Sequence, residues 1–190
     1  MSVLNARNLA GAVLCALWAV PLQSATAQEP TGIRADLIAD LDQTEEKWVA
    51  LADAMSADLY AWRPMEGVRS VGEVFMHIAG ANVFFAKFLG YTPTDDLPEA
   101  LKNFAPGVER SPSDMAQTKA LLHASFETAR AAIRSIPDAD LEQTMEFFGQ
   151  DMSKRAMILL LCTHAHEHLG QQVAYARSNK VVPPWSQGGQ

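Results

Sequence analysis

The sequence has almost no cysteine. Cys15 and Cys162 are the only two among 190 residues, and Cys15 lies in the N-terminal leader described below, so the folded part keeps a single thiol. An internal disulfide is therefore excluded, so the protein is not one of the small exported domains that depend on several disulfides for stability. A zinc site made of four cysteines is excluded for the same reason.

Basic residues are also scarce, and none of them cluster. Lysine and arginine total 15 against 22 aspartate and glutamate residues, giving a net charge of −7. A protein of this charge is poorly suited to bind nucleic acid or an anionic membrane surface. We therefore predict no nucleic-acid partner, and no membrane association once the leader has been removed.

Long apolar runs are absent, and the longest stretch lies at the N-terminus. Arg7 precedes an apolar segment from Leu9 to Val20, and Ala25-Thr26-Ala27 has the small-x-small pattern of a cleavage site. The segment is too short to span a bilayer as a helix. We expect residues 1–27 to be a secretory signal peptide, with an uncleaved N-terminal anchor or a buried core helix as the alternatives. The mature protein, residues 28–190, is then exported, either periplasmic or secreted.

Four segments show the three- and four-residue apolar spacing of amphipathic helices, and none shows convincing strand alternation. They run from about residue 32 to 55, 70 to 90, 111 to 136 and 151 to 179. We predict an all-α fold, a single four-helix bundle over residues 28–190 with long connecting segments. Those connections are long enough to cross the bundle, so the sequence leaves its topology open.

Two of these helices carry clear start signals. Ser70 and Glu73 have the spacing of a capping box, in which each side chain bonds a backbone amide of the other residue. Ser111-Pro112-Ser113-Asp114 has a capping serine, a proline suited to the first helical position and an acidic residue three positions after the cap. We expect the second and third helices to open at Ser70 and Ser111.

Histidine provides the candidate metal ligands. His164 and His168 are four residues apart on the last predicted helix, so both imidazoles lie on one face, which also carries apolar side chains. His77 lies beside the apolar stripe of the second helix, and metal sites in bundles are built from facing helices. The alternative is that these are ordinary core or boundary histidines. His123 and His166 lie off the corresponding faces and are not predicted to be ligands.

The segment His164-Ala165-His166-Glu167-His168 also matches H-x-x-E-H, the inverted zinc-protease pattern. That class needs a further acidic metal ligand downstream of the motif. No aspartate or glutamate occurs from Leu169 to Gln190, which argues against a protease.

Three stretches in this order resemble the DinB-like superfamily of metalloenzymes, and the resemblance runs from about Ile33 to Ser186. The stretches are Tyr60–Pro64 followed by Arg69–Ala79, then His164–Gln171, and last Val181–Ser186. The resemblance implies a four-helix bundle with a histidine triad, one ligand from the second helix and two from the fourth. Those positions match His77, His164 and His168.

The resemblance further implies a divalent metal ion, zinc or nickel foremost, with iron or manganese also compatible. Some members are thiol-dependent transferases or hydrolases, and many form dimers, so a homodimer is one arrangement that it allows. The function predicted here is a metal-dependent hydrolase or thiol-type transferase acting on an unknown small molecule. The alternatives are a non-catalytic exported metal-binding or stress-associated protein, and a metal-free bundle acting through partners.

The catalytic residues beyond the triad stay unassigned. Glu167 is a candidate base, but it is better interpreted as a solvated carboxylate or one that orients an imidazole. Gln171 continues the His164–His168 face and is expected either to contact a ligand or the substrate, or to hydrogen-bond between helices; Asn82 and Tyr175 are weaker candidates of the same kind. Cys162 is expected to be a small buried hydrophobe.

Overall fold

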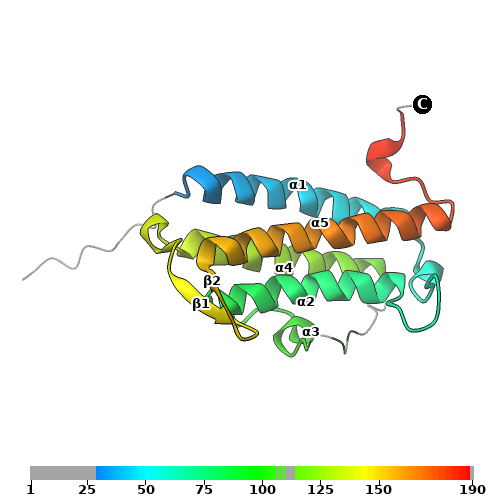
Figure 1. The fold of residues 1–190 in the computed structure, drawn as a ribbon. Coiled ribbons are helices and arrows are strands. Elements are labelled where there is room, and N and C mark those ends of the chain that lie inside the picture. The colour runs from blue at the N-terminus through cyan, green and yellow to red at the C-terminus, as the bar shows by residue number, and fades with distance from the viewer. Residues whose placement is uncertain (1–28, 106, 108, 110–113, 189–190) are drawn as a thin grey trace, which may run out of the picture.

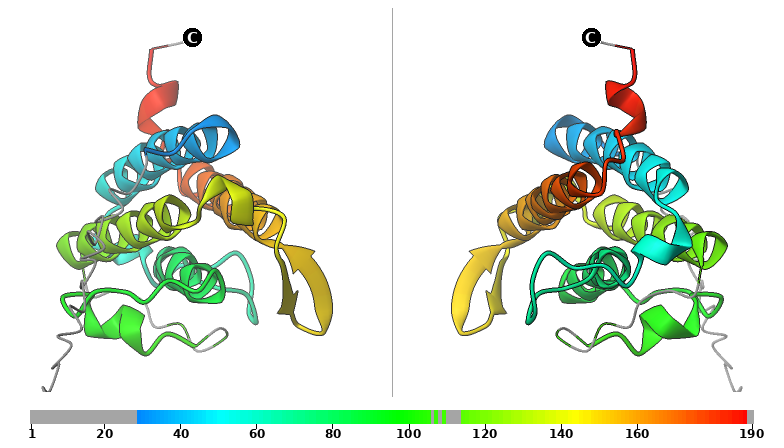
Figure 2. Two further views of the ribbon diagram at one scale, coloured as in Figure 1. Left: turned by 90° about the vertical axis from the view of Figure 1, so that its left-hand side faces the viewer. Right: turned by 90° about the vertical axis from the view of Figure 1, so that its right-hand side faces the viewer.

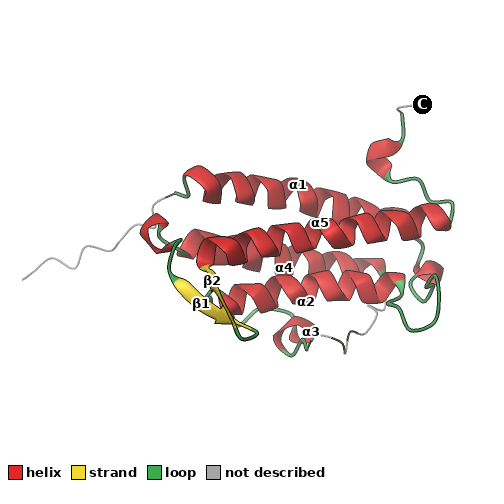
Figure 3. Ribbon diagram, viewed as in Figure 1, coloured by secondary structure: helices red, strands yellow, loops and turns green. Residues whose placement is uncertain are grey.

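The computed structural model describes residues 29–105, 107, 109 and 114–188, so the predicted leader and the predicted Ser111 cap lie outside the described residues. Four long helices form the fold and confirm the all-α bundle (Figures 1 and 3). They are α1 (Gly32–Ala54), α2 (Val71–Phe88), α4 (Met115–Ser135) and α5 (Lys154–Ser178). No helix among the described residues is long and apolar enough to cross a membrane.

Helices that follow one another in sequence are not always packed against one another in the bundle. Helices α1 and α2 each pack mainly against α4 and α5. In Figure 1, α1 and α5 run in one direction and α2 and α4 in the other, so the connection from α2 to α4 returns along the length of the bundle. This answers the question of topology that the sequence left open. Viewed end-on in Figure 2, α2 and α5 lie side by side, which brings the helix of His77 next to the helix of His164 and His168.

The expectation of no strand is wrong in one place. A short antiparallel hairpin, β1 (Thr144–Phe147) and β2 (Gln150–Ser153), precedes α5. Each strand has four residues, too few for alternation to be read from the sequence. The turn between them has positive φ at Phe148 (50°) and Gly149 (78°), the pattern of a tight hairpin turn.

The helix starts were predicted in part. The Ser70–Glu73 capping box is present: the amide of Glu73 donates to Ser70 Oγ at 3.3 Å, and the amide of Ser70 donates to Glu73 Oε2 at 2.7 Å. The third long helix does not open at Ser111. It begins at Met115 with Asp114 as its cap, because the side chain of Asp114 accepts from the amide of Gln117 at 2.8 Å.

A second, smaller apolar cluster holds the α2–α4 connection against the bundle. The connection includes the single-turn helix α3 (Glu99–Lys102), and its Leu97 and Leu101 are buried against Met76 and Val83 of α2. Phe104 lies so close to Gly80 that a Cβ there would be 2.0 Å from the phenylalanine ring. The missing side chain thus lets the connection lie directly on α2, just before it reaches Glu109.

Candidate metal centre

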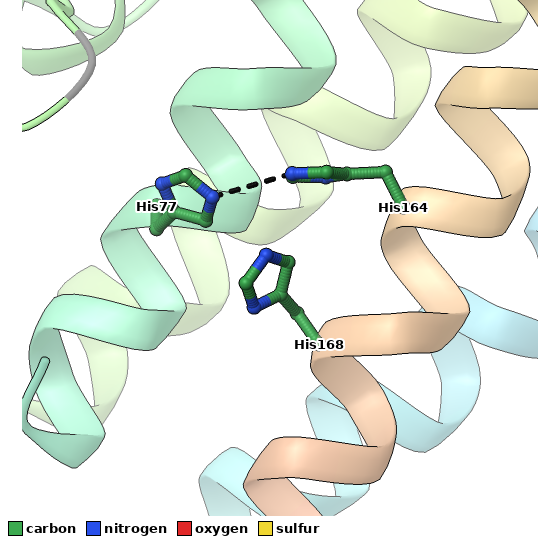
Figure 4. A group of neighbouring side chains, drawn as sticks. All are labelled: His77, His164 and His168. Carbon is green, nitrogen blue, oxygen red and sulfur yellow. Dashed lines mark hydrogen bonds between the residues drawn. The ribbon is translucent and has the colours of Figure 1, made fainter. Parts of the chain in front are cut away.

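The structure brings the three predicted ligands together. His77 comes from α2 and His164 and His168 from α5, and one nitrogen of each lies within 4.8 Å of the others. The Nε2 atoms of His77 and His164 are 3.3 Å apart. All three rings point toward one another across the space between the two helices (Figure 4). His77 is buried and the other two are half-buried.

A buried carboxylate holds the ring of His77 from behind. Nδ1 of His77 donates to Glu109 Oε1 at 2.7 Å, and the Glu109 side chain is only 5% exposed. The same oxygen accepts from Arg69 Nη2 at 3.0 Å and from the amide of Gly107 at 3.1 Å. With its proton on Nδ1, His77 turns a bare Nε2 toward His164, which is the form that binds a metal ion.

His168 is held by a second chain of hydrogen bonds. Its Nδ1 donates to Gln171 Oε1 at 2.6 Å, and Gln171 Nε2 donates to the Tyr175 hydroxyl at 2.9 Å. That hydroxyl in turn donates to the carbonyl oxygen of Arg69 at 3.2 Å. Gln171 therefore contacts a predicted ligand, and Arg69 joins the two chains, through its guanidinium on one side and its carbonyl on the other.

The protonation states suit metal binding. Burial lowers the pKa of His164 to about 3, with further lowering from His168, His77 and Arg69. Burial also lowers the pKa of His77, against the opposing effect of its bond to Glu109. Although burial alone would raise the pKa of Glu109, hydrogen bonds from Gly107, His77 and Arg69 lower it to about 2. At neutral pH, His77 and His164 are neutral and the carboxylate is charged, so these residues fit a divalent cation.

These shifts predict how the metal-free protein responds to acid. Because the folded-state pKa of His164 lies below its unfolded value of 6.5, the unfolded state binds the extra proton first, so stability is lost as pH falls from about 6.5 toward 3. The free energy of unfolding is measured by urea titration, in the presence of a chelator, at pH 7, 6 and 5. Its decrease per pH unit should be smaller in His164→Ala than in the wild type, by up to about 1.4 kcal/mol. Identical slopes would contradict the buried neutral imidazole.

The other histidines lie apart from the triad, as predicted. Nδ1 of His123 is 2.6 Å from Glu45 Oε1, and Nε2 of His166 is 2.8 Å from a carboxylate oxygen of Asp40. Both therefore bond to carboxylates of α1.

Among the remaining candidates, Glu167 is exposed, and no hydrogen bond among the described residues joins it to the triad. Asn82 faces α4, where it donates to Ser125 Oγ at 3.3 Å. Cys162 is buried, as expected, and burial raises the pKa of its thiol to about 12.

Sequence reasoning missed Glu109 and Arg69. Glu109 lies 32 residues beyond His77, in a connection without helical periodicity, so no spacing rule links the two. Arg69 directly precedes the Ser70 cap, and only the fold reveals that it faces the triad. A carboxylate behind a ligand histidine is common in metal sites, but the sequence suggested Glu167 for that role, and the structure places Glu109 there.

Comparison with known proteins agrees with this architecture. Two crystal structures of DinB-like proteins are similar, one from Bacillus cereus ATCC 10987 and one from Bacillus subtilis. The first has a TM-score of 0.66 and 18% identity, covering 79% of this chain and 95% of that one. The second has a TM-score of 0.60 and 19% identity, covering 80% and 99%. No curated protein matches the chain.

A family profile described as the DinB superfamily matches residues 40–172, and the chain therefore belongs to the DinB superfamily.

Proposed function

We propose that this protein is a metal-dependent enzyme, a hydrolase or thiol-type transferase for a small molecule, in which His77, His164 and His168 bind one divalent ion. One observation carries the proposal. Three imidazoles converge within 4.8 Å, and the outer nitrogens of two of them are bonded to Glu109 and Gln171. Histidines that were adjacent only through core packing would not require hydrogen bonds that orient two of the three rings toward a common point.

Three protein ligands favour an open site over a closed one. Structural zinc sites close with four protein ligands, whereas catalytic sites keep a position for water or substrate. An ion held by three imidazoles would lower the pKa of a bound water or thiol toward neutrality. Imidazole ligands suit zinc or nickel, and iron or manganese are further candidates.

The surrounding residues have separate tasks in this proposal. Glu109 is engaged with His77 and Arg69, so it orients an imidazole and balances the charge of the ion. Arg69 keeps that carboxylate in place and brings a positive charge to the rim of the site. Its Nε atom is buried and has no hydrogen-bond partner among the described residues.

Our proposal includes export: the signal peptide predicted over residues 1–27 supports a location in the periplasm or outside the cell. The acidic character of the chain, with a net charge of −7, supports a small-molecule substrate over nucleic acid.

Elemental analysis tests the proposal. Residues 28–190 are purified without a metal-affinity column, beside a His164→Ala/His168→Ala variant and a His123→Ala control. We expect close to one equivalent of metal in the wild type and in His123→Ala, and none in the double variant. No metal in any of them after incubation with excess ions would overturn the proposal. Stoichiometric metal without turnover of thiol or ester substrates would favour the non-catalytic alternative.

A further inference from the structure

Aromatic side chains gather at one end of the α2–α5 pair, next to the triad. Five of the chain's eight phenylalanines are joined there by ring contacts. This aromatic cluster comprises Phe84, Phe85 and Phe88 of α2 with Phe147 and Phe148 of the β1–β2 hairpin. Figure 1 shows the hairpin beside the end of α2 and the start of α5.

The cluster is continuous with the triad. The ring of Phe85 meets that of His164 edge-on, with centroids 5.3 Å apart. The ring centroids of Phe147 and Phe85 are 6.1 Å apart, and those of Phe148 and Phe147 are 4.5 Å apart. An unbroken series of aromatic contacts therefore runs from a candidate metal ligand to the surface of the hairpin.

Phe148 is an unusual residue for its position in the turn. Its φ of 50° is unfavourable for a bulky side chain, and tight turns of this type favour asparagine or aspartate before glycine. The residue is 76% exposed, so burial does little to offset the backbone cost, although its ring contacts those of Phe84, Phe88 and Phe147. A bulky apolar residue at a strained and exposed position next to a candidate site points to a role in binding.

We propose that the aromatic cluster binds an alkyl or aryl group of the substrate while the polar end of that molecule lies at the triad. This inference rests on the proposed function, and it adds the substrate class: a molecule with a substantial apolar part. Continuity with His164 favours this occupant over a second copy of the chain. The other large exposed hydrophobic side chains are scattered over different elements: Ile33, Met65, Leu159, Val182 and Trp185.

Alkyl hydroxamic acids separate the two parts of the proposal, because the hydroxamate binds the metal while the tail tests the cluster. Dissociation constants of acetohydroxamate and octanohydroxamate are measured on the zinc-loaded protein by calorimetry. A fully buried methylene improves affinity about fourfold. With six extra methylenes partly buried, we expect octanohydroxamate to bind at least about 30-fold more tightly.

Phe148→Asn is the informative variant, because asparagine suits the turn. We expect it to keep or raise the melting temperature and to leave acetohydroxamate binding unchanged, while the preference for the long tail falls at least about fivefold. Trp185→Ala is the matched control. Trp185 is an aromatic residue, 43% exposed, on the 3₁₀ turn Pro184–Ser186, which packs on α1, and its loss should leave the tail preference intact.

The outcomes are distinguishable. Equal affinity for both hydroxamates would overturn the inference about the cluster and leave the metal site standing. Failure of acetohydroxamate to bind would overturn the open metal site, and this inference with it. A wild-type dimer that becomes a monomer in Phe148→Asn, seen by size-exclusion chromatography with light scattering, would show that the hairpin is a dimer contact and would also overturn the inference.

Discussion

Replacing Glu109 with glutamine is expected to weaken metal binding by about 10- to 100-fold, the usual cost of losing a carboxylate behind a ligand histidine. The amide keeps the size of the side chain but removes the negative charge that holds the Nδ1 proton of His77 and pairs with Arg69. The imidazole then becomes a weaker and less well oriented ligand. Competition with a chromogenic chelator measures the change in dissociation constant.

Glu167→Gln is the matched control for this experiment. Glu167 is an exposed carboxylate directly before His168 in the sequence, so the same chemical change close to the triad should leave metal affinity within about twofold, since exposed charges contribute little. The cobalt-loaded protein adds a spectroscopic readout, because its visible absorption changes when His77 reorients. If Glu109→Gln and Glu167→Gln had the same affinity as the wild type, Glu109 would have no part in the site.

Loss of Glu45 is expected to destabilise the protein by about 3 kcal/mol, because it leaves a buried guanidinium without its main counterion. The side chains of Arg130 and Glu45 are 10% and 11% exposed, and their atoms are 2.5 Å apart. For a domain of this size, Glu45→Ala should lower the melting temperature by roughly 6 to 12 °C. Thermal unfolding of the metal-free protein by circular dichroism measures this change.

The same arginine supplies the control. Arg130 also pairs with Glu127 at 3.0 Å, but that side chain is 62% exposed. Glu127→Ala should therefore cost no more than about 1 kcal/mol, since solvent screens the pair. Equal losses in the two variants would mean that burial does not set the strength of the ion pairs on this arginine. Metal content should be unchanged in both, because His123, the other partner of Glu45, lies apart from the triad.

The long helices and the triad could be predicted because their signals are local. Apolar spacing identified the four helices, and the Ser70–Glu73 capping box located the start of α2 to the residue. The four-residue separation of His164 and His168 places both on one helical face whatever the rest of the chain does. Pairing them with His77 needed the resemblance, since periodicity alone does not say which face of α2 meets α5.

The rest depended on contacts between residues distant in sequence. Glu109 reaches His77 because the connection after α2 folds back over Gly80, and no local pattern records that path. The topology of the bundle could not be predicted for the same reason, since long connections permit several packing arrangements of the same helices. The hairpin was not predicted because two strands of four residues leave no alternating run.

The origin of the ligands on two helices has a consequence for the lifetime of the protein. His77 and His164 are 87 residues apart in sequence, so an ion bound by both would hold together two distant parts of the folded chain. It would stabilise the folded state because the unfolded chain does not preserve the site. In the exported protein proposed above, whose folded part has a single cysteine, the ion would stabilise the fold where an internal disulfide cannot. This stabilisation would be reversible, and its size would depend on the concentration of free metal. Removal of the ion by a chelator would then raise the unfolded fraction that proteases can cleave, and metal supply would govern how long each molecule survives.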